Sequence, residues 1–165
     1  MKKERFTVQS DDIPIAGHFL TSEEGETRPL LVLCHGAPSG APPEPGDGGY
    51  PELAQKLYER GYAAAWFNFR GTGESGGNID FLGWTHDLSA VLDFLLTKGG
   101  FCKGQVFPVG FSAGAGTAIY VSARDKRVTG VVSCSCPADF SLFLDRDPRS
   151  IIEGYRQIGA IRDSG

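Results

Sequence analysis

The chain has 165 residues, a length that suits a single domain. Its 20 acidic residues outnumber its 16 lysines and arginines and give a formal net charge of −4, which argues against a nucleic-acid-binding protein because such proteins need a basic face. Hydrophobic residues make up 41% of the sequence, enough for a packed core, and no apolar run approaches the roughly 18 residues of a membrane span.

Strand-like and helix-like segments alternate along the chain. Strands are predicted over residues 5–10, 13–21, 29–34, 62–69, 105–109 and 128–135. The first two are expected to pair in antiparallel fashion through a turn at Asp11-Asp12. The mainly apolar runs 29–34 and 62–69 are typical of strands buried on both faces of a sheet.

Helices are predicted between and after these strands, over residues 51–61, 80–97, 113–123 and most of 138–165. The first begins at Pro51 and ends at Gly61, and Pro148 is expected to divide the last. Strands that alternate with helices imply the α/β class, with a mainly parallel sheet and helices on both faces. We expect a single domain, because no linker or internal repeat interrupts the chain.

The cysteines and the start of the chain predict a cytoplasmic protein. The chain opens with charged residues, and no apolar segment of a secretory signal peptide follows. The four cysteines match no zinc-binding spacing: Cys34, Cys102, Cys134 and Cys136. We expect reduced thiols, no metal site and no organic cofactor.

A G-x-S-x-G sequence occupies residues 110–114 (GFSAG). Such a match is weak by itself, but an apolar strand enters it and a helix leaves it, as in a nucleophile elbow. Gly110 and Gly114 satisfy the need for small residues on either side of a serine in a strained turn. Ser112 is therefore the predicted nucleophile; the alternative is a plain glycine-rich turn.

Nucleophilic attack by a serine creates an oxyanion, which two preorganised N–H donors stabilise. One is expected to be the backbone N–H of Ala113, at the positive end of the helix dipole. The other is expected in the loop that follows strand 29–34. Because Pro38 lacks an N–H, Ala37 is the expected donor there.

Three segments in this order resemble the α/β-hydrolase superfamily, of the serine esterase, lipase and aminopeptidase-like kind. Residues 33–36 (LCHG) resemble its oxyanion loop, 69–75 (FRGTGES) its R-G-x-G-x-S loop and 110–114 its elbow. The resemblance covers about residues 5 to 137. It implies hydrolysis of ester, thioester or amide bonds through an acyl-enzyme on Ser112, with a small molecule or short peptide as substrate.

The resemblance also implies a catalytic order of serine, acid and then histidine along the chain, and this sequence departs from it. All three histidines precede Ser112: His18, His35 and His86. His35 and Gly36 correspond to residues that support the oxyanion loop. His35 is also the best-placed alternative base, whereas His86 is expected on an exposed helix face and His18 lies in the N-terminal hairpin.

Asp139 follows strand 128–135, at a position that some hydrolases of the superfamily use for the catalytic acid. The alternative is a helix-capping role before Phe140 and Leu144. With no histidine after Ser112, we expect the N-terminal part of the fold without its last strands, in which 138–165 begins a lid. A non-catalytic binding protein on a truncated hydrolase scaffold is the alternative function.

Two other features have competing interpretations. Residues 71–76 (GTGESG) match the dinucleotide-binding pattern G-x-G-x-x-G. The next helix is expected only at residue 80, and the acid some 20 residues on, Asp93, falls inside that helix, so a dinucleotide site is disfavoured. Arg70 is expected in a structural ion pair, with binding of a substrate carboxylate as the alternative.

Overall fold

The computed structural model describes residues 1–23, 26–42, 44–139 and 147–162. Within them, the strands are β1 (Lys2–Ser10), β2 (Ile13–Thr21), β3 (Arg28–Cys34), β4 (Ala63–Phe67), β5 (Phe101–Phe111) and β6 (Val132–Cys134). The helices are α1 (Gly49–Glu59), α2 (Gly83–Thr97), α3 (Ala113–Ser122) and α5 (Pro148–Gln157).

The strands form one six-stranded sheet in the order β1-β2-β4-β3-β5-β6. β1 pairs with β2, and β2 with β4, in antiparallel fashion, whereas β3 is parallel to β4 and β5, and β5 to β6. Asp11 and Asp12 both have positive φ, of 49° and 62°, as a tight hairpin turn requires. The predicted α/β class is confirmed.

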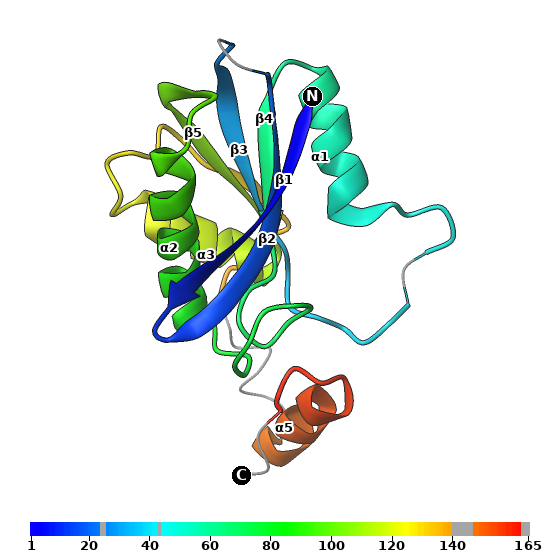
Figure 1. The fold of residues 1–165 in the computed structure, drawn as a ribbon. Helices are drawn as coiled ribbons and strands as arrows, with labels where there is room; N and C mark the ends of the chain where they lie inside the picture. The colour runs from blue at the N-terminus through cyan, green and yellow to red at the C-terminus, as the bar shows by residue number, and fades with distance from the viewer. Residues whose placement is uncertain (24–25, 43, 140–146, 163–165) are drawn as a thin grey trace.

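Helices cover both faces of the sheet, with α1 on one face and α2 and α3 on the other (Figure 1). Alternate residues of β3 point to the two sides: Leu30 and Val32 belong to the core under α2 and α3, and Leu31 and Leu33 to the core under α1. Among the described helices, none combines the length and apolarity needed to cross a membrane.

Some boundaries differ from the sequence predictions. α1 begins at Gly49, two residues early, because Asp47 Oδ1 accepts a hydrogen bond from its backbone N–H at 2.8 Å. β6 is shorter than the predicted 128–135, since before Val132 only Thr129 is hydrogen-bonded to β5. α5 begins at Pro148, where the last helical segment was expected to divide; the segment before it, residues 140–146, lies outside the described residues.

An ion pair inside the protein fixes the glycine-rich loop that follows β4. Arg70 is 5% exposed and Asp87, on α2, is fully buried. The Arg70 guanidinium donates to Asp87 Oδ1 at 2.7 and 3.0 Å, and its backbone N–H donates to Oδ2 at 2.9 Å. Asp11 accepts a further bond from Arg70 at 2.8 Å. Of the two roles considered for Arg70, the structure shows the ion pair.

Removing Asp87 should leave the buried Arg70 charge without its main partner. We expect Asp87→Ala to lower the free energy of unfolding by about 3–5 kcal/mol, as for other broken buried pairs. Asp93→Ala is the matched control on the same helix, because Asp93 pairs with Arg127 at the surface and such pairs contribute about 1 kcal/mol or less. Equal losses for the two variants in urea denaturation would contradict this account.

Candidate active site

Ser112 lies in the sharp turn between β5 and α3. Its φ of +51° and ψ of −123° are unusual for a residue with a side chain and cost on the order of 1–3 kcal/mol. Two hydrogen bonds hold this conformation: the Ser112 N–H donates to the Cys134 carbonyl at 2.9 Å, and the Ser112 carbonyl accepts from Ala115 at 2.9 Å. The residue is exposed, so the strained turn presents a hydroxyl to solvent.

The glycines on either side of Ser112 allow three backbone segments to meet at this turn. A Cβ at Gly110 would collide with the backbone of Ala115, and one at Gly114 with the carbonyls of Cys34 and His35. The first contact keeps the turn tight, and the second brings α3 directly against the end of β3. Both positions therefore require glycine because a side chain would collide with the backbone.

The loop after β3 lies beside the serine. A Cβ built on Gly36 would stand 3.1 Å from Ser112 Cβ and 3.7 Å from its Oγ, so only hydrogen atoms separate this loop from the nucleophile. Ala37 follows Gly36 directly, and Ala113 is the first residue of α3. Within the described part of the chain, neither the Ala37 N–H nor the Ala113 N–H donates a hydrogen bond.

The imidazole of His35 joins the two loops that flank this turn. Its Nε2 accepts the N–H of Phe69 at 3.0 Å and lies 3.0 Å from the Thr72 hydroxyl, while Nδ1 lies 2.7 Å from the Gly36 carbonyl. Because Nε2 accepts, Nδ1 must carry the proton and donate it to Gly36. Burial lowers the pKa of His35, so the ring is neutral at pH 7 and both nitrogens are occupied.

The two other histidines have partners away from the elbow, and Asp139 follows β6. His86 is exposed and its Nδ1 lies 2.7 Å from Asp11 Oδ2; His18 stacks on Trp66, with ring centres 5.3 Å apart. Asp139 is exposed beyond β6, and the helix that it was alternatively expected to cap would fall in residues 140–146, outside the described residues.

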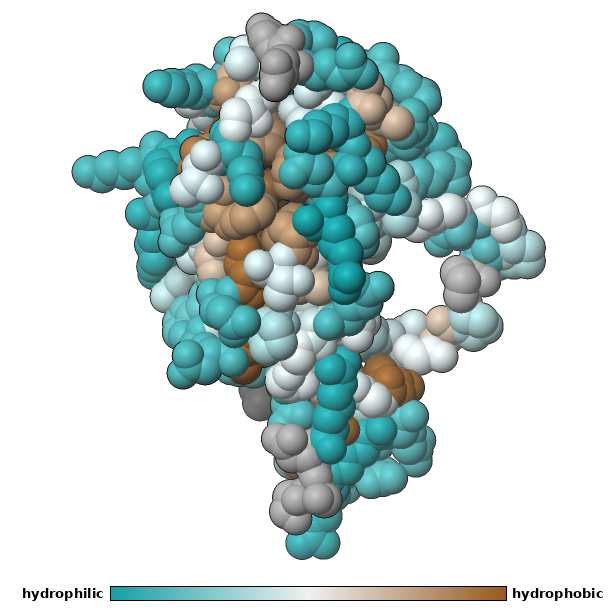
Figure 2. Space-filling view, in the orientation of Figure 1, coloured by the Kyte–Doolittle hydropathy of each residue, from teal (hydrophilic) through white to brown (hydrophobic). Residues whose placement is uncertain are grey.

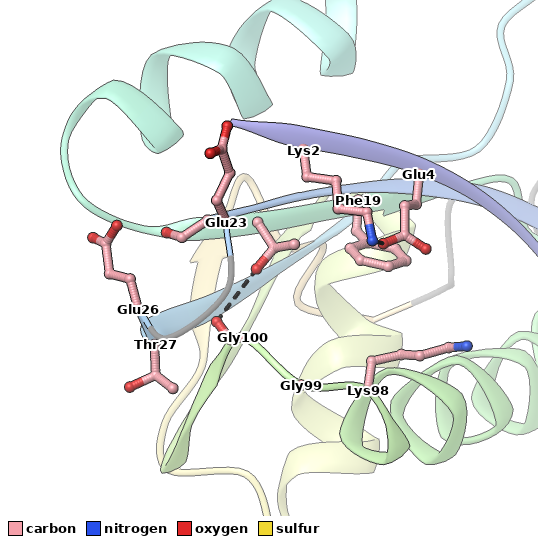
Figure 3. A pocket seen from close by; sticks show the side chains of 11 residues that line it. Lys2, Glu4, Phe19, Glu23, Glu26, Thr27, Lys98, Gly99 and Gly100 are labelled. Carbon is pink, nitrogen blue, oxygen red and sulfur yellow. Dashed lines mark hydrogen bonds and ion pairs between the residues drawn. The ribbon is translucent and has the colours of Figure 1, made fainter.

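A pocket of about 500 Å³ opens beside the oxyanion loop. Sequence reasoning missed two of its aromatic residues, Tyr50 and Trp66, because no motif marks them, and it considered His18 only as a base. A second pocket, of about 480 Å³, is lined by Lys2, Glu4, Phe19 and Gly100 (Figure 3). It lies at the opposite edge of the sheet, where the parallel strands begin, and contains none of the predicted site residues.

The described residues offer no cluster of metal ligands. Within residues 1–23, 26–42, 44–139 and 147–162, no three histidine, cysteine or acidic side chains gather as metal ligands do. All four cysteines are free thiols.

The fold is that of the α/β hydrolases. The α/β hydrolase GrgF from Penicillium sp. sh18 has a TM-score of 0.74 at 19% identity, covering 95% of this chain and 53% of that one. The esterase PF2001 of Pyrococcus furiosus has a TM-score of 0.70 at 20% identity, covering 96% and 62%. These similarities bear out the predicted fold and show that the chain spans little more than half of these structures.

The sequence comparison assigns the family. Residues 15–142 match the X-Pro dipeptidyl-peptidase (S15 family), and the chain belongs to this family of hydrolases. The uncharacterized protein YcjY of Escherichia coli (strain K12) is 30% identical over 122 residues, which are 72% of this chain and 39% of that protein.

His35 is neutral and hydrogen-bonded through both ring nitrogens, and this makes the free energy of unfolding depend on pH. Its pKa is lowered from 6.5 by burial, so the unfolded chain binds a proton more readily than the folded chain does. Stability is then full above about pH 6.5 and falls as the pH drops toward the folded-state pKa. We expect His35→Gln to flatten the dependence of the free energy of unfolding on pH between about 7 and 5.

The reference for this measurement is the wild type in the same buffers. A smaller slope should persist in His35→Gln, since burial also lowers the pKa of His18. Parallel curves for the wild type and His35→Gln would contradict the assignment of a neutral, structural His35.

Proposed function

We propose that the chain carries the nucleophile and oxyanion hole of a serine hydrolase that cleaves ester, thioester or amide bonds. One observation carries the proposal: Ser112 has a strained, left-handed backbone at a strand-to-helix turn, with an exposed hydroxyl beside Gly36. Strain of this kind persists where function needs a side chain in one position. A small molecule or short peptide is the substrate.

In the first step, Ser112 Oγ attacks the carbonyl carbon and a base takes its proton. The N–H groups of Ala37 and Ala113 then bind the developing oxyanion, helped by the positive end of the α3 dipole. Collapse of this intermediate breaks the bond to the leaving group, which receives the proton from the base. Water attacks the acyl-enzyme in the same manner and releases the acid.

The base is proposed to be a histidine from outside residues 1–165. The three histidines of this chain have other partners. His35 is hydrogen-bonded to Gly36 and Phe69, His86 to Asp11, and His18 stacks on Trp66. The chain spans 39% of YcjY, and a triad in the order serine, acid, histidine has its base after the acid. Asp139, just beyond β6, is the candidate acid.

The segment 138–165 is proposed as the beginning of a lid. Its described part lies at the edge of the sheet where the parallel strands end, next to the loops around Ser112 (Figure 1). A Cβ on Gly40 would meet Ile158, and the Arg162 guanidinium donates to the carbonyls of Ser75 and Gly73 at 2.6 and 3.2 Å. A cytoplasmic location completes the proposal, supported by the free cysteines.

A fluorophosphonate probe tests the nucleophile and the base separately. The isolated chain should label slowly, because a general base normally contributes about 10²–10⁴-fold. Added imidazole should supply the missing base and raise the labelling rate with its concentration. Ser112→Ala should abolish this labelling, measured by intact-protein mass spectrometry.

Ser135→Ala is the matched control, since Ser135 is also exposed and also has a φ of +51°. It should label like the wild type. Rapid Ser112-dependent labelling without imidazole would overturn the external base. An absence of Ser112-dependent labelling at every imidazole concentration would overturn the nucleophile and favour the non-catalytic binding protein.

A further inference from the structure

The pocket beside the oxyanion loop is lined by two stacked rings from neighbouring strands. His18 on β2 pairs directly with Trp66 on β4, and their rings lie 5.3 Å apart and within 18° of parallel. Both side chains are partly buried, and neither strand was singled out by a catalytic motif. The two rings stack on each other on the face of the sheet that carries α1, so each covers one face of the other.

This pocket shares the loop after β3 with the proposed reaction centre. Gly36 and Pro38 both line it, and the proposed oxyanion donor, Ala37, lies between them. Gly36 is also the residue in contact with Ser112. A carbonyl whose oxygen bound the Ala37 N–H would therefore lie beside two residues that line the pocket.

Four of the polar side chains that line the pocket have partners within the protein. His35 uses both ring nitrogens, the Thr72 hydroxyl donates to Phe69, and the Asn68 Oδ1 accepts the backbone N–H of Glu74. The Glu74 carboxylate pairs with Arg5 at 2.8 Å. The aromatic and proline side chains give the pocket apolar surface as well, and this surface favours an uncharged group.

A cationic ligand is disfavoured for a separate reason. The Lys3 ammonium lies 5.4 Å from the centre of the Trp66 ring, so the protein already supplies the cation that an indole face attracts. Burial lowers the pKa of His18, and its neutral ring adds no charge to attract an anion. The volume of about 500 Å³ falls within the usual range for small-molecule pockets.

We propose that this pocket binds an uncharged aromatic ring of the substrate, packed against the stacked pair of His18 and Trp66 and held next to the reacting carbonyl. The inference rests on the proposed function, because it is the position of Ser112 that makes the pocket a substrate site. It narrows the substrate class to esters, thioesters or amides with an aryl group on one side of the scissile bond.

Two other concave sites, a pocket and a groove, give weaker support for a ligand. The pocket of Figure 3 contains an internal ion pair, with Lys2 2.9 Å from Glu4, and lies at the far edge of the sheet from Ser112. The apolar groove between Leu53, Phe107 and Val132 has no feature that selects an occupant. Figure 2 shows a face that is mainly hydrophilic, with its hydrophobic residues gathered in a central patch.

Tryptophan fluorescence reports binding directly. The chain has two tryptophans, and Trp84 is fully buried, so a ring stacking in the pocket should quench Trp66. The probes are two isomeric amides, N-methyl phenylacetamide and N-benzylacetamide, which carry the phenyl ring on opposite sides of the amide bond. At least one should quench with a Kd of about 1 mM, and its cyclohexyl analogue should bind at least about fivefold more weakly.

Variants locate the site by saturation-transfer NMR, which does not need Trp66. Trp66→Ala should weaken binding of the phenyl amide about tenfold. Tyr62→Ala is the matched control, because Tyr62 is an exposed aromatic residue that lines the apolar groove instead, and it should leave binding unchanged. Circular dichroism checks that each variant is folded.

Equal binding of the phenyl and cyclohexyl amides, or unchanged binding in Trp66→Ala, would overturn the ring site. The proposed function can fail independently: ring binding in a chain whose Ser112 never labels would uphold the pocket and reject the nucleophile. Ser112-dependent labelling without ring binding would do the reverse. The isomer with the lower Kd identifies the side of the scissile bond that carries the ring.

Discussion

The strained backbone of Ser112 is the constraint on which the rest of this site depends. Four segments hold it: β6 accepts its N–H through Cys134, β5 leads into it at Gly110, α3 leaves it, and the oxyanion loop touches it at Gly36. A side chain at Gly110 or Gly36 would push one of these segments away. The conformation is therefore a property of the whole carboxyl edge of the sheet and not of the pentapeptide alone.

Two different interactions, a neutral hydrogen-bonded ring and an ion pair, keep the loops around this turn in place. His35 links the oxyanion loop to the loop after β4 as a neutral ring, with one nitrogen donating and the other accepting. Arg70 anchors the same loop to α2 through a buried ion pair with Asp87. The link through His35 depends on a neutral ring with one free lone pair, and the link through Arg70 depends on a buried pair of opposite charges.

Much of the fold was predictable because it follows from local patterns. The apolar run of β3 and the glycines of the elbow each specify structure within a few residues, and the family order of the motifs placed Ala37 beside Ser112. The aromatic pocket was not predictable, since His18 and Trp66 are 48 positions apart and meet only through the strand register. The identity of the catalytic base was equally out of reach, because every histidine of the chain has another role in the described structure.

The strand β6 has a consequence for handling the protein in solution. In the part of the chain that the structure describes, β6 has a neighbour on one side only, and Val132 is 47% exposed. A bare strand edge with apolar side chains is a template for further strand pairing. The isolated chain is accordingly a candidate for concentration-dependent self-association, in which one molecule extends the sheet of another.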